Sequence, residues 1–365
     1  MASAGITEQV AIRGVASVVP EARIENSTFV GRFGGEGVEK FAKMTGVTAR
    51  HVATANQTAS DFACCAAERL LARLDWARDS IDALVFVSQT PDYTLPATAC
   101  VLHHRLGIKT DCAAFDMNLG CSGFVYGLLV AGNLCRKNAF RRVLLCGGDT
   151  ITKLVSPHDR SAAMLFGDGG FAVALEHDEA APAWSWLFRT HGGGFREIIV
   201  PTGAFRHRQG DATPREFGDG IVRGDYDLAM NGTEVFNFTI SEVPAAIRQQ
   251  MQSTGQTVET TDLLVMHQAN AFILKNIAKM TKFPMTKVPI SMDRYGNTSV
   301  TSIPLTLCDT LSGQPDSVPL NLLLAGFGVG LSWGIVSLRL PPSVCLPITT
   351  CANGYVDEVN GGWHV

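Results

Sequence analysis

The chain has 365 residues, of which 46% are hydrophobic and 18% are charged, with a formal net charge of −4 and a pI of about 6.1. This length and composition allow a large core in two ordinary domains or one duplicated unit, and they exclude a small scaffold held together by disulfides. The mild negative charge makes nucleic acid and anionic membrane surfaces poor partners.

The N-terminal segment, residues 1–20, has no basic region followed by an uninterrupted apolar run, so it does not resemble a signal peptide. No stretch reaches the roughly 18 uninterrupted apolar residues that a membrane-spanning helix needs. We therefore expect a cytoplasmic protein without a membrane segment. The 10 cysteines are then reduced thiols, and because none has the Cys/His spacing of a metal site, no metal is expected.

Helical patterns and short apolar runs alternate along the chain. We predict helices at 61–77, after a Ser60 cap, at 122–138 and at 271–280. We predict buried strands at 83–87, 143–148, 171–175, 263–267 and 321–326. The alternation of strands with helices predicts an α/β fold built on a mainly parallel sheet.

Two pairs of segments in the chain resemble each other. IDALVFVSQT (81–90) resembles TDLLVMHQAN (261–270), and VLLCGGD (143–149) resembles LLLAGFG (322–328), in the same order. The similarity indicates an internal duplication, although buried strands can also look alike by chance. We predict an N-terminal half at 1–190, a C-terminal half at 191–340 whose Gly/Arg-rich start at 191–224 connects the two, and a peripheral extension at 341–365.

Cys121 lies in FDMNLGCSGFVYG, where a strand-like stretch turns at Gly120 into a helix that opens with Ser122. The positive end of a helix dipole and free backbone N–H groups lower the pKa of a thiol in this position and favour the thiolate. Cys121 is therefore a candidate nucleophile. A buried structural cysteine in a tight strand-to-helix turn has the same pattern, so these letters alone leave both interpretations open.

Two further candidates follow in the second half. His267 ends the apolar run LLVM, which places it at the carboxyl end of a buried strand, where ligands of open α/β sheets bind. Asn297 follows Gly296, which permits a sharp turn, and Thr298, Ser299 and Thr301 can cap the next helix. A satisfied core histidine and a plain turn remain the alternatives at these positions.

Glycine-rich segments suggest other chemistries, but their patterns are incomplete. Segments 167–170, 191–194 and 326–330 contain neither a phosphate loop nor the full dinucleotide-binding pattern, and no Gly-x-Ser-x-Gly motif occurs. The last of these segments, GFGVG, can offer backbone N–H groups to a developing oxyanion, or it can form a tight turn without chemistry.

The chain closely resembles the 3-oxoacyl synthase III branch of the thiolase superfamily over most of residues 8–340, in five motifs that keep the same order. These are GCSGFVYG around Cys121, LFGDGG (165–170), VMHQAN around His267, RYGNTS around Asn297 and GFGVGLSWG (326–334). The resemblance implies a duplicated five-layer α-β-α-β-α thiolase fold, a homodimer, and convergence of the three catalytic residue types where the two halves meet.

The same resemblance implies roles for these residues. Cys121 would carry the acyl group, the backbone N–H groups of Cys121 and Val329 would form the oxyanion hole, and His267 and Asn297 would donate hydrogen bonds to an enolate. Acyl-CoA or an acyl carrier protein would deliver the thioester substrate, and no resident cofactor is implied. Four substrate-contacting residues are implied, which are Leu95 from a partner subunit, Arg160 near the coenzyme A adenine, Asn270 and Phe327.

Four positions depart from the pattern of the family. Lys40 and Met44 replace a Trp and an Arg that lie near the adenine in the family, and Phe272 replaces an Arg associated with docking of the carrier protein. Val329 replaces a Gly beside the oxyanion hole. These changes indicate a specialised enzyme, of secondary metabolism, rather than the housekeeping starter of fatty acid synthesis.

We therefore predict a condensing acyltransferase that loads Cys121 and then uses a malonyl-type extender, with decarboxylation. One rival is an acyltransferase that forms an ester or amide, with His267 as general base. A rival of another class is a non-catalytic thiolase-fold partner subunit. A cysteine hydrolase is the weakest alternative, because an acyl enzyme must be protected from water to survive.

Overall fold

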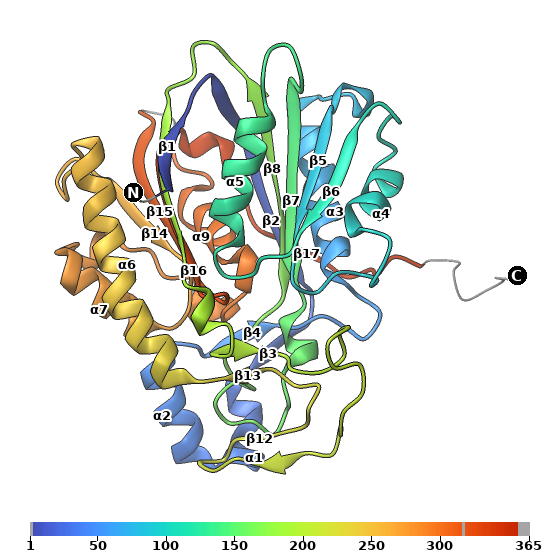
Figure 1. The fold of residues 1–365 in the computed structure, drawn as a ribbon, viewed down its shortest axis with the longest axis vertical. Helices are drawn as coiled ribbons and strands as arrows, with labels where there is room; N and C mark the ends of the chain where they lie inside the picture. Colours follow the sequence, from blue (N-terminus) through green and yellow to red (C-terminus); the bar gives the residue numbers. More distant parts are fainter. Residues whose placement is uncertain (1–2, 316–317, 357–365) are drawn as a thin grey trace, which may run out of the picture.

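The computed structural model describes residues 3–315 and 318–356, and these residues form two mixed β-sheets with helices on their faces (Figure 1). Sheet A has the strand order β1 (Ser3–Thr7), β9 (Trp184–Thr190), β16 (Ser332–Leu340), β15 (Leu320–Gly328) and β14 (Leu263–Met266). Sheet B has the order β17 (Thr349–Cys351), β2 (Val10–Pro20), β8 (Gly169–His177), β7 (Arg142–Asp149), β5 (Ala83–Val87) and β6 (Ala113–Met117).

Helices form three further layers around and between the sheets (Figure 1). The layers are α3 (Ala59–Leu74) and α4 (Thr98–Arg105) outside sheet B, α5 (Gly123–Leu134) and α9 (Ser302–Leu311) between the sheets, and α6 (Gly232–Thr254) and α7 (Ala271–Thr281) outside sheet A. Three buried apolar clusters fill the spaces between these layers. The predicted five-layer α-β-α-β-α fold is confirmed.

The two sheets repeat one pairing pattern. In sheet B, β5 is parallel to β7, and β7, β8 and β2 follow as antiparallel neighbours. In sheet A, β14 is parallel to β15, and β15, β16 and β9 follow in the same way. The resemblance between the segments around β5 and β14, and between those around β7 and β15, therefore reflects a structural duplication rather than chance.

The prediction of a mainly parallel sheet holds for sheet B, where three of the five strand pairs are parallel, but it is wrong for sheet A, where three of the four are antiparallel. In sheet A the reason is local: only residues 329–331 separate β15 from β16, and such a short connection joins antiparallel neighbours. Strands β1 and β9 precede residue 191 in the chain but pair in sheet A. Sheet pairing thus crosses the predicted boundary between the halves at residue 190.

The helix ends differ from the predicted ones by a few residues. Helix α3 begins at Ala59, after Thr58, whose backbone N–H donates to the Asp61 carboxylate at 2.8 Å. Ser60, the predicted cap, lies inside the helix and its hydroxyl donates to Asp92 at 2.6 Å. The Thr58–Asp61 spacing satisfies the first backbone donors better, which is why the helix starts earlier than predicted.

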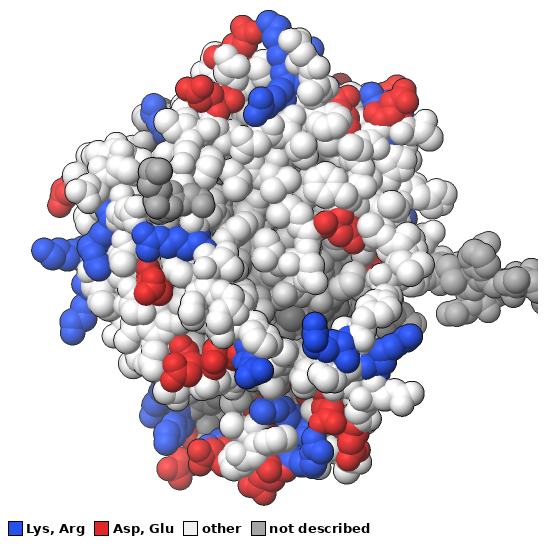
Figure 2. Space-filling model, in the orientation of Figure 1, with Lys and Arg blue, Asp and Glu red and all other residues white. Residues whose placement is uncertain are grey.

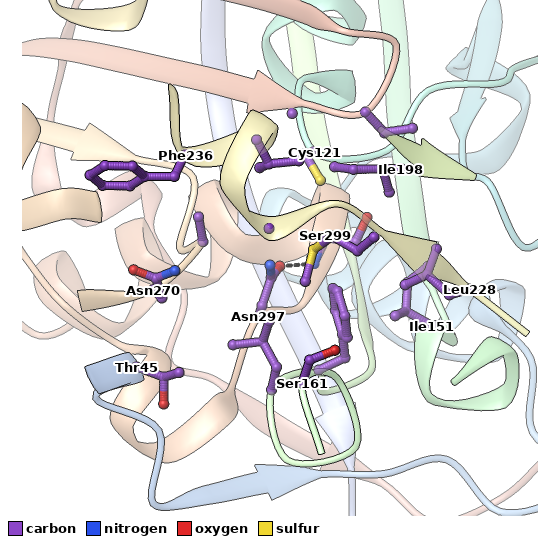
Figure 3. Close-up of a pocket in the computed structure, with 18 of the residues that line it drawn as sticks. Thr45, Cys121, Ile151, Ser161, Ile198, Leu228, Phe236, Asn270, Asn297 and Ser299 are labelled. Atoms are coloured by element: carbon purple, nitrogen blue, oxygen red, sulfur yellow. Dashed lines mark hydrogen bonds between the residues drawn. The ribbon is translucent and has the colours of Figure 1, made fainter. Parts of the chain in front are cut away.

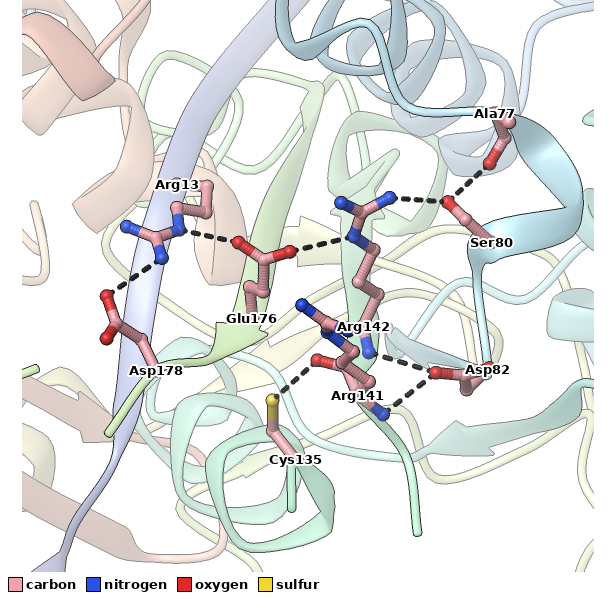
Figure 4. Close-up of polar contacts among 9 residues, drawn as sticks. All are labelled: Arg13, Ala77, Ser80, Asp82, Cys135, Arg141, Arg142, Glu176 and Asp178. Carbon is pink, nitrogen blue, oxygen red and sulfur yellow. Dashed lines mark hydrogen bonds and ion pairs between the residues drawn. The ribbon is translucent and has the colours of Figure 1, made fainter. Parts of the chain in front are cut away.

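Polar contacts tie together the ends of the sheet B strands that lie away from Cys121 (Figure 4). The Asp82 carboxylate accepts hydrogen bonds from the backbone N–H groups of Arg141 and Arg142, at 2.8 and 3.1 Å. Glu176 on β8 pairs with the side chains of Arg142 and Arg13, each at 2.9 Å. These contacts hold the starts of β5 and β7 and the end of β8 in register.

A smaller region lies below the two sheets in Figure 1. It contains α1 (Val30–Phe33), α2 (Gly35–Thr45), β3 (Arg23–Glu25), β4 (Ala49–His51), α8 (Met292–Tyr295), and the short strands β10 (Ile198–Ile199), β11 (Arg215–Glu216), β12 (Val222–Arg223) and β13 (Ala229–Met230). On the face seen in Figure 2, charged side chains gather over this lower region, whereas the middle of the face carries few of them.

The described part of the C-terminal extension packs against the N-terminal half. Strand β17 runs parallel to β2, and the backbone N–H of Tyr355 donates to Asp61 at 2.9 Å. The rest of the predicted extension, 357–365, lies outside the described residues. Among the helices of the described ranges, none is both long and apolar enough to cross a bilayer.

Candidate active site

Cys121 lies in the turn between β6 and α5, where the backbone N–H of Gly123 donates to the carbonyl of Gly120 at 2.6 Å. Gly328, the last residue of β15, passes directly over it. A Cβ on Gly328 would lie 2.5 Å from Cys121 Cβ and 2.9 Å from its sulfur, and the φ of Gly328 is 150°. Only glycine permits this approach, so the two halves of the chain meet at the nucleophile.

The environment of Cys121 does not produce the lowered pKa expected from its position before a helix. Burial raises the pKa of the thiol to about 11, although hydrogen bonds from the backbone N–H groups of Val329 and Cys121 lower it. The Ser299 side chain, which lines the same cavity, also lowers the pKa of the thiol. Desolvation outweighs these donors, so the resting group is a neutral thiol. The two backbone donors are the ones expected to form the oxyanion hole.

His267 follows β14 directly, and its backbone N–H donates to the carbonyl of Ala325 at 2.8 Å. Its Nδ1 lies 2.7 Å from Ser302 Oγ, and its ring packs edge-on against Phe327 at 5.6 Å between centroids. Burial lowers the pKa of the imidazole to about 3. The ring is therefore uncharged at neutral pH, which suits a hydrogen-bond donor better than a strong base.

Asn297 is held by the turn at Gly296, whose φ is 70°. A Cβ at Gly296 would lie 2.8 Å from the carbonyl oxygen of Leu165, and the backbone N–H of Asn297 donates to that same oxygen at 2.9 Å. Asn297 Oδ1 accepts a hydrogen bond from the Ser299 backbone N–H at 3.0 Å (Figure 3). Because Oδ1 is engaged, the amide nitrogen is the donor that this side chain offers.

One cavity of about 950 Å³ brings these residues together. Among its lining residues are Cys121, Arg160, His267, Asn270, Asn297, Phe327 and Val329. Most of the remaining wall is apolar, as with Ile151, Ile198, Leu228 and Phe236 (Figure 3). Seven of the eight residues predicted for the site thus share one cavity, and their individual roles stay predictions.

Leu95 is the predicted site residue that does not line this cavity. It lies in the connection between β5 and α4 and is 78% exposed. Such exposure agrees with a side chain that reaches a partner subunit, which stays a prediction. Asn270 lines the cavity, but its Oδ1 accepts from the backbone N–H of Ile273 at 2.8 Å, so it also caps α7.

The four departures from the family pattern all face this cavity. Lys40 and Met44 extend from α2, and Phe272 from α7 stacks on Phe236 at 5.3 Å between ring centroids. The connection 191–224 supplies part of the opposite wall, and its Gly220 carbonyl accepts from the backbone N–H of Arg160 at 3.0 Å. The entrance is thus more apolar than the resemblance alone implies.

The sequence did not single out Ser299 and Asp149 as site residues. The sequence predicts only a capping function for Ser299, and Asp149 directly follows the predicted strand at 143–148. Ser299 lines the cavity with a φ of 50°, and its side chain counteracts the rise in pKa that burial causes at both Cys121 and Asp149. A polar residue two positions after Asn297 was the available signal, but its contacts depend on strands distant in the chain.

Comparison with known proteins decides the family. The model described as 3-oxoacyl-[acyl-carrier-protein] synthase III matches residues 115–192, and the model of its C-terminal part matches 251–340. The Beta-ketoacyl-[acyl-carrier-protein] synthase III of Xanthomonas campestris is 35% identical over 329 residues, covering 90% of this chain and 97% of that protein. This chain belongs to the 3-oxoacyl-[acyl-carrier-protein] synthase III family.

Solved structures agree with that membership. A 3-oxoacyl-(acyl-carrier protein) synthase from Burkholderia xenovorans LB400 is 40% identical, with a TM-score of 0.90 over 96% of this chain and 99% of that chain. The synthase III from Pseudomonas aeruginosa PAO1 is 30% identical, with a TM-score of 0.75 over 92% and 99% of the two chains. The chain is therefore a condensing acyltransferase of this family, as its motifs indicated.

The described residues contain no candidate metal site. Within 3–315 and 318–356, no group of three or more His, Cys, Asp or Glu side chains is placed to hold an ion.

Proposed function

We propose that this synthase III loads an acyl group from a thioester onto Cys121 and condenses it with a malonyl-type thioester that loses CO2. The observation that supports the proposal is the shared cavity of Cys121, His267 and Asn297. A thiol and two neutral donors are the groups that such a two-stage reaction needs. The acyl and malonyl thioesters are the substrates, delivered by coenzyme A or an acyl carrier protein, and no resident cofactor takes part.

The first stage transfers the acyl group. The Cys121 sulfur attacks the thioester carbonyl, and the backbone N–H groups of Cys121 and Val329 stabilise the oxyanion that forms. Collapse of this intermediate expels the donor thiol and leaves an acyl-Cys121 thioester. Forming a covalent intermediate divides one difficult step into two easier ones.

The second stage makes the carbon–carbon bond. Loss of CO2 from the malonyl-type thioester leaves an enolate, whose oxygen accepts hydrogen bonds from His267 and Asn297. The enolate carbon then attacks acyl-Cys121 and expels the Cys121 thiolate, which takes up a proton from solvent to restore the resting thiol. An uncharged His267 is suited to this role, because burial holds its pKa at about 3.

The ester- or amide-forming rival is less well supported. It requires His267 to remove a proton from an alcohol or amine, and an imidazole whose pKa is about 3 is a weak general base at neutral pH. The non-catalytic partner and the hydrolase are disfavoured by the retention of all three catalytic residue types in a largely apolar cavity.

We also propose that the acyl substrate belongs to specialised metabolism. The apolar entrance formed with Met44 and Phe272, and a cavity of about 950 Å³, suit a larger or more apolar acyl donor than acetyl-CoA. Condensation of acetyl-CoA with malonyl carrier protein at the rate of a housekeeping starter enzyme would contradict this assignment. The expected cytoplasmic location stays a prediction.

A homodimer is the assembly that we propose. Strand β6 lies at one edge of sheet B, and its residues, Ala113–Met117, are all only partly buried. A second copy pairing along this edge would cover it, and it would bring the exposed Leu95 towards a neighbouring cavity. Light scattering that gives the mass of a single chain at micromolar concentration would rule out the dimer.

The deciding experiment is intact-mass analysis after incubation with a panel of acyl-CoAs. We expect one acyl adduct on the wild type and none on Cys121→Ala. Adding labelled malonyl thioester to the acylated protein should release CO2 and form a carbon–carbon bond. The catalytic assignment is wrong if the wild type takes up no acyl group, or if Cys121→Ala takes up as much.

A further inference from the structure

The C-terminal extension is fixed to the body of the molecule at several points. It lies beyond residue 340, where the match to the model of the family's C-terminal part ends. Strand β17 adds a parallel edge strand to β2, and Cys351 at its end is buried. Further along, the guanidinium of Arg105 covers the ring of Tyr355 at 4.4 Å. Because these contacts fix its position, the extension can support the parts of the chain that rest against it.

The loop at residues 54–57 rests against the extension. The Gln57 side chain is 1% exposed, and its Nε2 donates to the carbonyl of Cys351 at 3.0 Å. Gly354 passes so close to the loop that a Cβ there would lie 2.5 Å from the carbonyl oxygen of Asn56. A buried side chain and closely packed backbone therefore join the loop to the extension.

Lys153 connects that loop to η3 (Ile151–Leu154), a single turn of 3-10 helix. Its Nζ donates to the carbonyl of Ala55 at 3.0 Å and to that of Gln57 at 2.5 Å. Hydrogen bonds from a charged donor are stronger than those between neutral groups. Cys351, Gln57 and Lys153 thus form a continuous path from the extension to η3, which we call the brace.

The turn η3 forms part of the wall of the active-site cavity. Ile151 and Leu154 both line the cavity, and so does Leu228. The backbone N–H of Leu228 donates to the carbonyl of Leu154 at 2.6 Å. Ile151 and Leu228 lie on the same side of the cavity in Figure 3. A shift of η3 would therefore move three apolar side chains that an acyl group can contact.

A second contact also holds η3, and it limits the effect that the brace can have. The backbone N–H of Thr152 donates to Asp168 Oδ1 at 3.0 Å, and Asp168 Oδ2 accepts the backbone N–H of Ala53 at 2.8 Å. Asp168 therefore keeps η3 close to the start of the loop without help from the extension. Weakening the brace should loosen this wall of the cavity rather than unfold it.

We propose that the C-terminal extension, acting through the brace, sets the length of the acyl group that Cys121 accepts. The brace keeps η3 in place, so an acyl chain that just fills the cavity packs against Ile151 and Leu228, whereas a longer chain must push this wall outward. Lys153 and Gln57 do not line the cavity, so they are positioning residues. This inference rests on the proposed acylation of Cys121.

Competition among straight-chain acyl-CoAs, from two to sixteen carbons, measures this preference when the adducts on Cys121 are followed by intact mass. The initial rates give the ratio of kcat/KM for each pair of chain lengths. Lys153→Met removes the ammonium of the brace, and Gly354→Ala forces the extension away from the loop. Each buried methylene is worth about fourfold in binding. In both variants, the rate for an acyl group two carbons longer than the preferred one should therefore rise about tenfold relative to the preferred one.

Two matched variants make the same kinds of change away from the brace. Lys137→Met removes an exposed ammonium that pairs with Glu179, and Gly192→Ala adds a Cβ that meets nothing within 4 Å. Neither should alter the preference for chain length. A preference that is unchanged in Lys153→Met and Gly354→Ala, or that shifts as far in the two controls, would overturn the proposal.

A double variant tests whether Gln57 and Lys153 act along one path. Gln57→Met breaks the contact with Cys351, and Lys153→Met breaks the contact with Gln57. Contacts in series give non-additive effects, so the double variant should shift the preference no further than Lys153→Met alone. Additive shifts would mean that the two side chains act independently, which contradicts the brace. Gln250→Met, at another glutamine that is 1% exposed, is the control for loss of a buried amide.

Alkylation of Cys121 by iodoacetamide distinguishes a moved wall from a damaged site. The reagent is small and carries no acyl chain, so its rate at the Cys121 peptide, followed by mass mapping, should not change in Lys153→Met or Gly354→Ala. If alkylation slows as much as acylation does at every chain length, the variants have damaged the site in general and the proposal is wrong.

Amide hydrogen exchange separates this inference from the proposed function, because it needs no acyl donor. A peptide that covers 151–154 should exchange about tenfold faster in Lys153→Met and Gly354→Ala than in the wild type, since a weaker contact makes local opening easier. If it does, and no acyl-CoA acylates the wild type, the brace holds the cavity wall but the acylation of Cys121 is wrong. If the wild type is acylated but neither exchange nor chain-length preference changes in the variants, the brace is wrong and the proposed function stands.

Discussion

The two halves of this synthase III use the same strand arrangement but place different chemistry at equivalent strand ends. In the N-terminal half, Val87 ends β5 and Asp149 ends β7. The equivalent positions in the C-terminal half are His267, directly after β14, and Gly328, which ends β15. The N-terminal half thus supplies the nucleophile and a buried carboxylate, and the C-terminal half supplies two neutral donors and a close backbone approach.

The starts of β5 and β14 make the same kind of backbone contacts in the two halves. Asp82 before β5 and Asp262 before β14 each donate a backbone N–H to the neighbouring strand, at 3.0 and 2.9 Å, and each carboxylate accepts backbone N–H groups there. Duplication therefore preserved the groups that set strand register. The halves diverged at the strand ends that face the cavity, where a change of side chain alters chemistry without disturbing the sheets.

We expect the largest effect from Gly328→Ala, which adds a Cβ at the end of β15, where the equivalent strand β7 ends in Asp149. The new Cβ would lie 2.5 Å from Cys121 Cβ, and the φ of 150° would be strained for any side chain. Displacing the nucleophile by even 1 Å costs about 100-fold in rate, so acylation measured by time-resolved intact mass should fall at least that far.

Gly192→Ala is a matched control for this change. Gly192 lies in the connection after β9, has no positive φ, and a Cβ there would meet nothing within 4 Å. Its acylation rate should stay at the level of the wild type. Acylation of Gly328→Ala at that same level would show that the close approach is not required.

A smaller loss, confined to the second stage, is expected for His267→Gln. Removing one donor from an oxyanion site lowers the rate by about 10² to 10³, so CO2 release from a malonyl thioester should fall by that factor. Acylation of Cys121 should continue. Equal losses in both stages would instead place His267 in the transfer of the acyl group.

The buried imidazole also predicts a dependence of stability on pH. Unfolded histidine titrates near 6.5 and His267 in the fold at about 3, so between these values the unfolded chain binds more protons. The stability from an uncharged His267 is fully present above pH 6.5 and is lost as the pH falls towards 3.

Urea unfolding of the wild type and His267→Gln between pH 7 and pH 4 measures this term. The free energy of unfolding of the wild type, relative to that of His267→Gln, should fall by about 1.4 kcal/mol for each pH unit below pH 6. A difference that does not change with pH would mean that His267 is solvated or already charged in the fold.

We expect the smallest effects from Asp82→Asn and Asp262→Asn, at the strand starts that the two halves share. Asp82 accepts two backbone hydrogen bonds and Asp262 accepts one, at 2.7 Å. Hydrogen bonds to a charged acceptor contribute about 1.5 to 3 kcal/mol, so both variants should lower the free energy of unfolding, and Asp82→Asn by more. Acylation rates should not change, because both residues lie at the far ends of the strands.

Much of the fold could be predicted from the sequence because its signals are local. The strands at 83–87, 143–148, 171–175, 263–267 and 321–326 all occur close to their predicted bounds, since a strand buried on both faces is a continuous apolar run. The repeated segments also indicated the duplication, and they placed His267 at a strand end. Together with the ordered motifs, this was enough to expect Cys121, His267 and Asn297 in one site.

Only the tertiary structure decided how those residues behave. The local sequence predicts a lowered thiol pKa at Cys121, but desolvation by both halves of the fold raises it, and no local pattern records that burial. The antiparallel strands depend on how short connections close. The hydrogen bond from the Val300 backbone N–H to Asp149 Oδ2, at 3.5 Å, joins residues 151 positions apart, which only long-range packing brings together. The sequence by itself determined which strand ends carry chemistry, and packing of the two halves determined their ionisation and their partners.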